Sequence, residues 1–128
     1  MARAIEIGQE FTVNKRISED DVKQFAEIST DHNPLHLNEE IAARSIFKRR
    51  VAHGMLTASL ISAALASMPG TIILLEISLS FKKPVFINDT LAAKAIVTKV
   101  ENDRISLDVE VTRNVDKVVI GTARILQK

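Results

Sequence analysis

The sequence has no cysteine, tryptophan or tyrosine, and only five phenylalanines. Without cysteine, the chain has no disulfide, no thiolate metal ligand and no cysteine nucleophile. Its formal net charge of +1 provides no basic field for nucleic acid, and few rings are present on which bases could stack. We therefore expect an aliphatic core and no nucleic-acid partner.

The remaining composition is that of an ordinary globular domain, with 46% hydrophobic and 26% charged residues. A chain of 128 residues is predicted to form one domain, residues 1–128. The N-terminal stretch MARAIEIGQEF has no apolar core of a secretory signal, which favours a cytoplasmic location. The longest apolar helical stretch, residues 54–67, is too short to cross a bilayer, so we expect no membrane association.

Three helices are predicted from the first half of the chain. Ser18 and the acidic residues after it are typical of a helix start, and this helix is expected to end near Thr30. A second short helix is expected from Asn38 to about Ser45. The third, residues 54–67, is apolar or small on every face, which indicates a buried helix.

The second half of the chain changes to a period of two, which is typical of strands. Four strands are predicted, separated by turn-like residues: LEISLSF (75–81), residues 90–100, RISLDVEVT (104–112) and VVIGTARIL (118–126). Short separators favour hairpins, and a further strand near Phe11–Lys15 would complete an antiparallel sheet with one apolar face. The expected fold is α+β, with this sheet wrapped around the helix 54–67 and its exposed edges covered by dimerisation.

The hexapeptide DHNPLH, residues 31–36, is predicted to be a loop, because Pro34 disfavours helical angles at Asn33. A carboxylate from Asp31 and an imidazole from His36 that face one cavity could hold a water, remove one proton and supply another. Asn33 could fix the loop by side-chain hydrogen bonds. Two alternatives stay open: these residues are ordinary turn formers, or Asp31, His32 and His36 bind a metal.

The predicted buried helix begins at His53 and Gly54. The Gly54 N–H would be an unpaired donor at the positive helix end, where a ligand carbonyl could approach it closely. The alternatives are a plain helix cap and, for His53, a packed structural role. Ser62, two turns later, could bond to Asp31 or to its own helix backbone.

Two basic groups, Lys48–Arg49–Arg50 and Lys82–Lys83, could meet the phosphates of a carrier. Such charges more often form a solvated surface. The sequence alone does not decide between these two interpretations.

Residues 25–56, FAEISTDHNPLHLNEEIAARSIFKRRVAHGML, resemble the hydratase-2 motif of MaoC-like (R)-specific enoyl-CoA hydratases. The pattern Asp-x-Asn-Pro-x-His is present at residues 31–36, and the family's Phe and His-Gly-Met match Phe47 and residues 53–55. The segment LSFKKPVFINDTL resembles the strand region that follows in that family. The similarity covers roughly residues 8–127 and is greatest to short, single-domain bacterial members, PhaJ-like, that supply polyhydroxyalkanoate synthesis.

The resemblance implies a hot-dog fold, usually a homodimer, and reversible syn hydration of trans-2-enoyl-CoA to (R)-3-hydroxyacyl-CoA. It implies that Asp31 and His36 hold the water, that the Gly54 N–H polarises the thioester carbonyl, and that Asn33 and Ser62 support the pair. No metal or other cofactor is implied, because coenzyme A is part of the substrate. The choice between coenzyme A and an acyl carrier protein, the chain length and the pathway within fatty acid metabolism stay open.

Two other functions are compatible with such a fold. A hot-dog acyl-CoA thioesterase or a carrier-protein dehydratase often has an acid on the central helix, whereas residues 54–75 contain no Asp or Glu. A non-catalytic acyl-binding or dimerisation module would need neither Asp31 nor His36.

Overall fold

The computed structural model describes residues 4–128, which form four helices and five strands. In chain order these are β1 (Glu10–Arg16), α1 (Glu19–Ser29), α2 (Pro34–Leu37), α3 (Glu39–Ala43), α4 (Gly54–Ala66), β2 (Ile72–Phe81), β3 (Thr90–Glu101), β4 (Arg104–Arg113) and β5 (Asp116–Gln127).

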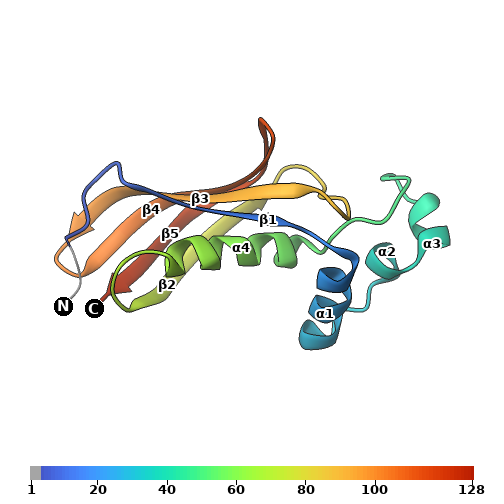
Figure 1. The fold of residues 1–128 in the computed structure, drawn as a ribbon, viewed down its shortest axis with the longest axis horizontal. Helices are drawn as coiled ribbons and strands as arrows, with labels where there is room; N and C mark the ends of the chain where they lie inside the picture. Colours follow the sequence, from blue (N-terminus) through green and yellow to red (C-terminus); the bar gives the residue numbers. More distant parts are fainter. Residues whose placement is uncertain (1–3) are drawn as a thin grey trace.

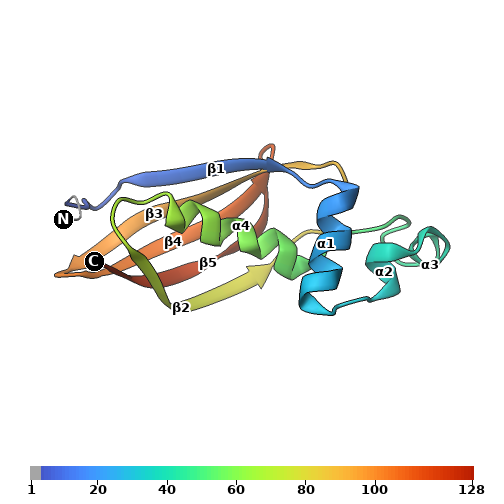
Figure 2. The ribbon, with the colours of Figure 1, turned by 60° about the horizontal axis from the view of Figure 1, so that its bottom comes forward.

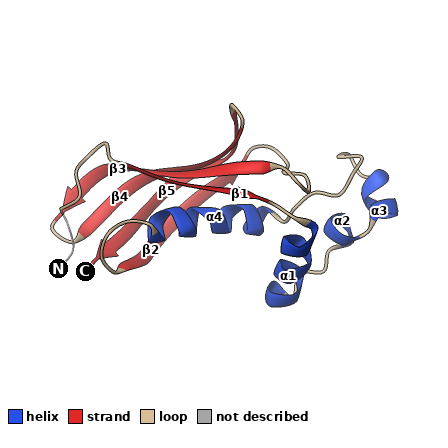
Figure 3. Cartoon of the chain, viewed as in Figure 1, coloured by secondary structure: helices blue, strands red, loops and turns tan. Residues whose placement is uncertain are grey.

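The strands form one antiparallel sheet in the order β1-β3-β4-β5-β2, and α4 lies along one face of it (Figures 1 and 3). The three other helices gather beyond the end of the sheet where α4 begins (Figure 2). The C-terminus lies near the opposite end (Figure 2). The predicted architecture, an antiparallel sheet around a central helix with an N-terminal strand in the sheet, is confirmed.

The core forms where α4 meets the concave face of the sheet. The predicted alternation along β4 is confirmed, because Ile105, Leu107, Val109 and Val111 are all buried. On β3 the facing positions include Ala93 and Ala95, whose small side chains let the helix approach the sheet closely. The core is aliphatic, as the composition predicts.

Strand β2 is different, because the side on which burial was expected stays largely open. Leu75, Ile77 and Phe81 are exposed, as are Ile73 and Leu74. β2 is an edge strand, and within residues 4–128 no further strand pairs with its outer side. The alternation along β2 therefore predicts the strand correctly, but the expected burial of its apolar side chains within the chain is wrong.

The helix boundaries agree with the prediction except in DHNPLH. The Ser18 hydroxyl accepts a hydrogen bond from Asp21 N, and Ser18 N donates the reciprocal bond to the Asp21 carboxylate. Thr30 ends α1 in the left-handed conformation. The loop prediction is wrong after Asn33, because residues 34–37 form the single turn α2. Asn33 does leave helical angles, but proline is favoured at the first position of a helix, and Pro34 occupies it here.

Glycine is required at position 121, where β5 passes very close to β2. A Cβ atom there would lie 1.9 Å from the Ser78 carbonyl oxygen. We expect Gly121→Ala to separate the two strands and lower the free energy of unfolding by at least about 1–3 kcal/mol. Urea denaturation measures this, with Thr122→Ala, an exposed neighbour, as the control that stays within about 0.5 kcal/mol of the original chain. Equal stability of both variants would contradict the close approach.

Candidate active site

His36 lies on the short helix α2, and the segment that leads into α4 fixes its ring. The side chain is buried, and its Nδ1 lies 2.7 Å from the Val51 carbonyl oxygen. A carbonyl can only accept a hydrogen bond, so Nδ1 carries the proton. In the neutral imidazole, Nε2 is then a free acceptor that can take a proton from water.

Asp31 lies on the loop between α1 and α2, which local hydrogen bonds hold in place. One carboxyl oxygen accepts from Asn33 N at 3.2 Å, and the Asn33 side chain accepts from Leu35 N at 3.1 Å. The Asp31 amide donates to the Ser29 hydroxyl. Among residues 4–128, the other carboxyl oxygen has no hydrogen bond, which leaves it available to a ligand.

His53, the residue before α4, contacts both members of the pair. Its Nε2 donates to the Asp31 main-chain carbonyl at 3.0 Å, and its ring stacks on His36 with centroids 4.0 Å apart. Phe25 contacts it as well, with ring centroids 4.9 Å apart. The side chain is almost fully buried, and burial lowers its pKa below the ordinary value of 6.5. His53 is thus a neutral, packed histidine that orients Asp31 and His36.

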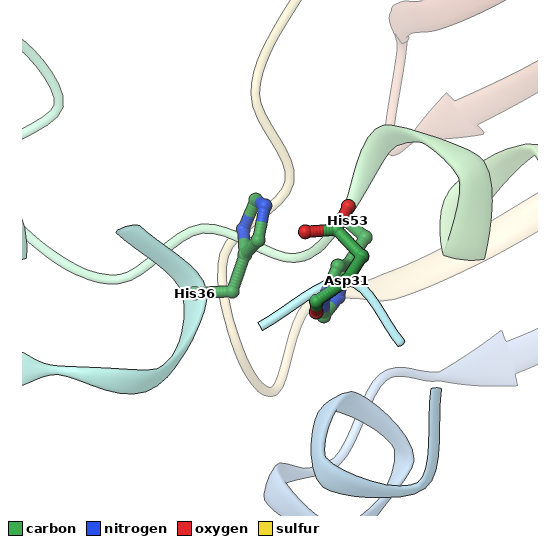
Figure 4. Close-up of side chains that lie close together, drawn as sticks. All are labelled: Asp31, His36 and His53. Atoms are coloured by element: carbon green, nitrogen blue, oxygen red, sulfur yellow. The ribbon is translucent and has the colours of Figure 1, made fainter. Parts of the chain in front are cut away.

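One polar atom each from Asp31, His36 and His53 lies within 4.8 Å of the others (Figure 4). A single water spans such a distance with two ordinary hydrogen bonds. The metal site considered from the sequence included His32. In the structure His32 is exposed, and the third residue beside Asp31 and His36 is His53. Imidazoles bind metals in the plane of the ring, and stacked rings tilted by only 32° do not direct their lone pairs at one point. The geometry therefore suits a held water better than a metal ion.

Gly54 is the first residue of α4, and its amide has no partner within the helix. The first helical hydrogen bond that reaches back to His53 comes from Thr57. Gly54 and His36 both line a cavity of about 340 Å³, together with Phe47, Val51 and Phe81. A donor at the positive end of α4 thus lines the same space as His36.

Ser62 lies apart from this group in the chain. It is exposed on α4, eight residues or about 12 Å along the helix from Gly54. It lines a second, apolar cavity of about 290 Å³ with Phe25, Met55 and Leu65 among others. No hydrogen bond between Ser62 and Asp31 is present within residues 4–128, so its predicted support of Asp31 is not seen in this chain.

The two basic groups separate in the structure. Lys82 and Lys83 line the cavity of His36 at its surface, and Lys83 pairs with Asp116 at 2.9 Å. Arg49 is exposed and stacks over Phe86 at 3.7 Å. For Arg50, both sequence interpretations are wrong, because it is buried and paired with carboxylates. The roles of Arg50 and the Val51 carbonyl could not be predicted from the sequence, because both depend on contacts between segments distant in the chain.

Acid is expected to destabilise the protein through His53. Its pKa is lower in the folded state, so the unfolded chain binds the proton more tightly. Stability is therefore full above about pH 6.5 and falls as the pH drops below it, by at most about 1.4 kcal/mol per pH unit.

Urea denaturation at a series of pH values measures this, compared with His53→Phe, which keeps a stacking ring but cannot titrate. The loss between neutral and mildly acidic pH should be smaller in that variant. Identical pH profiles of the two proteins would rule out His53 as the cause.

The chain matches a protein-family model described as MaoC like domain over residues 2–119. An (R)-specific enoyl-CoA hydratase of Aeromonas caviae is 44% identical over 105 residues, which is 80% of this chain and 78% of that protein. An (R)-specific enoyl-CoA hydratase of Rhodospirillum rubrum is 47% identical over 97 residues, 73% of this chain and 67% of that protein.

Comparison of the structure with solved structures finds the same kind of protein. The solved structure of an (R)-hydratase from A. caviae involved in PHA biosynthesis superimposes with a TM-score of 0.93 and 36% identity, covering 99% of this chain and 100% of that chain. The expected hot-dog fold is confirmed by this agreement. Because the family model spans most of the sequence and both relatives share over two fifths of the aligned residues, this chain belongs to the family of proteins with a MaoC-like domain.

Proposed function

We propose that this protein is an (R)-specific enoyl-CoA hydratase, which reversibly adds water to trans-2-enoyl-CoA to give (R)-3-hydroxyacyl-CoA. Two observations carry the proposal: a carboxyl oxygen of Asp31 lies within 4.8 Å of a ring nitrogen of His36, and His36 lines the same cavity as Gly54 at the start of α4. The family and the hydratase relatives agree with it.

The two side chains can hold one water from both sides. The free oxygen of Asp31 and Nε2 of His36 are both acceptors, so a water between them donates both of its hydrogens. Its lone pair then faces away from the pair, toward C3 of an enoyl group. As the oxygen bonds to C3, one proton passes to the pair and a proton is returned to C2 on the same face, which gives syn addition.

The negative charge that builds during this step falls on the thioester oxygen, as an enolate. The Gly54 N–H at the start of α4 is suited to stabilise it, because a backbone donor there is fixed and lies at the positive helix end. The space beside Gly54 is narrow, because a Cβ atom there would lie only 3.2 Å from the Phe81 ring. Glycine therefore keeps this space open for the thioester group. The supporting role of Asn33 is its hydrogen bonding in the loop, and that of Ser62 stays a prediction.

The substrate would lie with its acyl chain toward the apolar second cavity, which Phe25 joins to His53. Lys82 and Lys83 at the surface of the first cavity are suited to a phosphate group, whether it belongs to coenzyme A or to a carrier protein. The reaction needs no metal or redox cofactor, so chelation should not slow it. Among residues 4–128, no helix is long and apolar enough to cross a membrane. A cytoplasmic location and a place in fatty acid metabolism, including polyhydroxyalkanoate supply, stay part of the proposal.

The thioesterase and the binding module are less well supported. Both would use the cavity, but neither requires a water held between Asp31 and His36. α4 carries no acidic side chain that could serve the carrier-protein or thioesterase pattern. The assay below separates all three functions.

Purified protein is expected to remove the conjugated absorbance of crotonyl-CoA without releasing free thiol. Asp31→Asn and His36→Ala should each lower turnover by about a hundredfold or more, because each removes one side of the proton transfer. Both variants should keep the far-UV circular dichroism of the original chain.

Four outcomes would contradict the assignment. Thiol release would indicate a thioesterase, and full turnover in either variant would remove that residue from the mechanism. No reaction with short or long enoyl chains, on coenzyme A or carrier protein, would favour the binding module. Loss of activity on addition of EDTA would contradict a metal-free reaction.

We also propose that two copies associate through β2. This edge strand exposes Ile73, Leu74, Leu75 and Ile77 to solvent, and α4 exposes Met55 beside it. Burying one such side chain stabilises by roughly 1.5–3 kcal/mol, so covering the strand with its own copy is favourable. Pairing two copies would also close an edge that otherwise invites aggregation.

Sedimentation is expected to show a dimer or a larger homo-oligomer for the original chain. Leu75→Lys places a charge on the exposed edge and should shift the protein toward monomer. Asp108→Lys, on the exposed side of β4, is the matched control and should leave the assembly unchanged. A monomeric original chain would contradict the proposal.

A further inference from the structure

The proposed base sits on an element that cannot hold itself in place. His36 belongs to α2, which has four residues and thus a single turn. Isolated helices shorter than about 12–15 residues are marginal in water, so α2 depends on contacts from elsewhere. Its ring is held by the Val51 carbonyl, but that bond does not fix the backbone that carries the ring.

The backbone of His36 is held by Arg50. Arg50 Nε donates to the His36 carbonyl oxygen at 2.7 Å. Its NH1 group lies 2.9 Å from Glu19 of α1 and 3.4 Å from Glu39 of α3. The hydrogen bond from Arg50 holds the pKa of Glu19 below its ordinary value. One side chain therefore ties α2 to the helices on both sides of it in sequence.

The burial of Arg50 is hard to explain by stability. Its side chain is only 9% exposed, and its NH2 group is buried without a hydrogen-bond partner among residues 4–128. Buried ion pairs often contribute no more to stability than apolar residues of similar size, because removing the charges from water is costly. Glu19 and Glu39 stay 44% and 77% exposed, so they would be hydrated if the arginine were lost.

From these contacts we infer that Arg50 is a positioning residue, which holds the backbone of His36 so that Nε2 meets the reacting water. This rests on the proposed hydratase function. Arg50 touches neither the water nor the substrate in this account. It acts through the Nε–carbonyl bond, with Glu19 and Glu39 fixing the guanidinium.

Arg50→Met keeps the length of the side chain and removes its donors. Turnover (kcat) on crotonyl-CoA is expected to fall by about tenfold to a hundredfold, the size of effect that a misplaced catalytic group produces. KM should change by no more than about twofold, because the substrate cavity is not altered. Arg50→Lys should recover part of the loss, since an ammonium can reach one acceptor but not all of them.

The matched control is Lys23→Met. Lys23 also pairs with Glu19, at 3.8 Å, but has no hydrogen bond to His36. It should keep the turnover of the original chain. In a His36→Ala background, Arg50→Met should cause no further loss, because a residue that acts only through His36 has nothing left to position.

Two kinetic results would overturn the inference: unchanged kcat in Arg50→Met, or an equal further loss in the His36→Ala background. Amide exchange gives a readout that does not need activity. The His36 and Asn38 amides, bonded to Asn33 and Pro34, should exchange faster in Arg50→Met but not in Lys23→Met. Unchanged exchange overturns the positioning role, whereas an inactive original chain with faster exchange overturns the hydratase proposal alone.

Discussion

The hydrogen bond between His36 Nδ1 and the Val51 carbonyl joins residues 31–36, which carry the acid–base pair, to the segment that starts α4. It fixes the tautomer of His36 and turns Nε2 into an acceptor. The same short segment supplies Arg50 to the His36 backbone, His53 to the Asp31 carbonyl and Gly54 to the cavity. A displacement of residues 50–54 would therefore disturb every group of the site at once.

The fold explains why this segment can be rigid. Ala52 N donates to the Val85 carbonyl at 2.7 Å, and Val51 forms an antiparallel bridge with Phe86. The segment is therefore held by the connection between β2 and β3. α4 then continues into the aliphatic core, where its buried side chains pack closely against the sheet. The site thus takes its rigidity from the core and its polar groups from the helices beyond the sheet.

The residues of the candidate site differ in their exposure to solvent. His36 and His53 are buried, whereas Asp31 and Gly54 stay accessible, so a substrate can approach without opening the core. Burial keeps His53 neutral, which avoids a second positive charge beside His36 when that ring takes up a proton. Keeping His53 uncharged is thus an electrostatic condition for the proposed proton transfer.

Much of this could be predicted from sequence, because local rules fix it. The alternation along β4 and the uniformly apolar α4 predict the sheet and the buried helix. The roles of Asp31, His36 and Gly54 are implied by the family resemblance and stay predictions. The single turn at Pro34 was missed because proline both ends and begins helices. The burial of Arg50 and the exposure of Leu75 could not be predicted, since they depend on contacts between distant segments and, in our proposal, on a second copy of the chain.

The most direct test is the stereochemistry of hydration in D₂O. Crotonyl-CoA is converted in deuterated water, and the product is analysed by NMR for the position and face of the new deuterium. One water held by Asp31 and His36 predicts a single deuterium at C2, on the same face as the new hydroxyl at C3, in the (R) product. Addition to opposite faces, or a mixture of both hydroxyl configurations, would contradict a pair that works from one side.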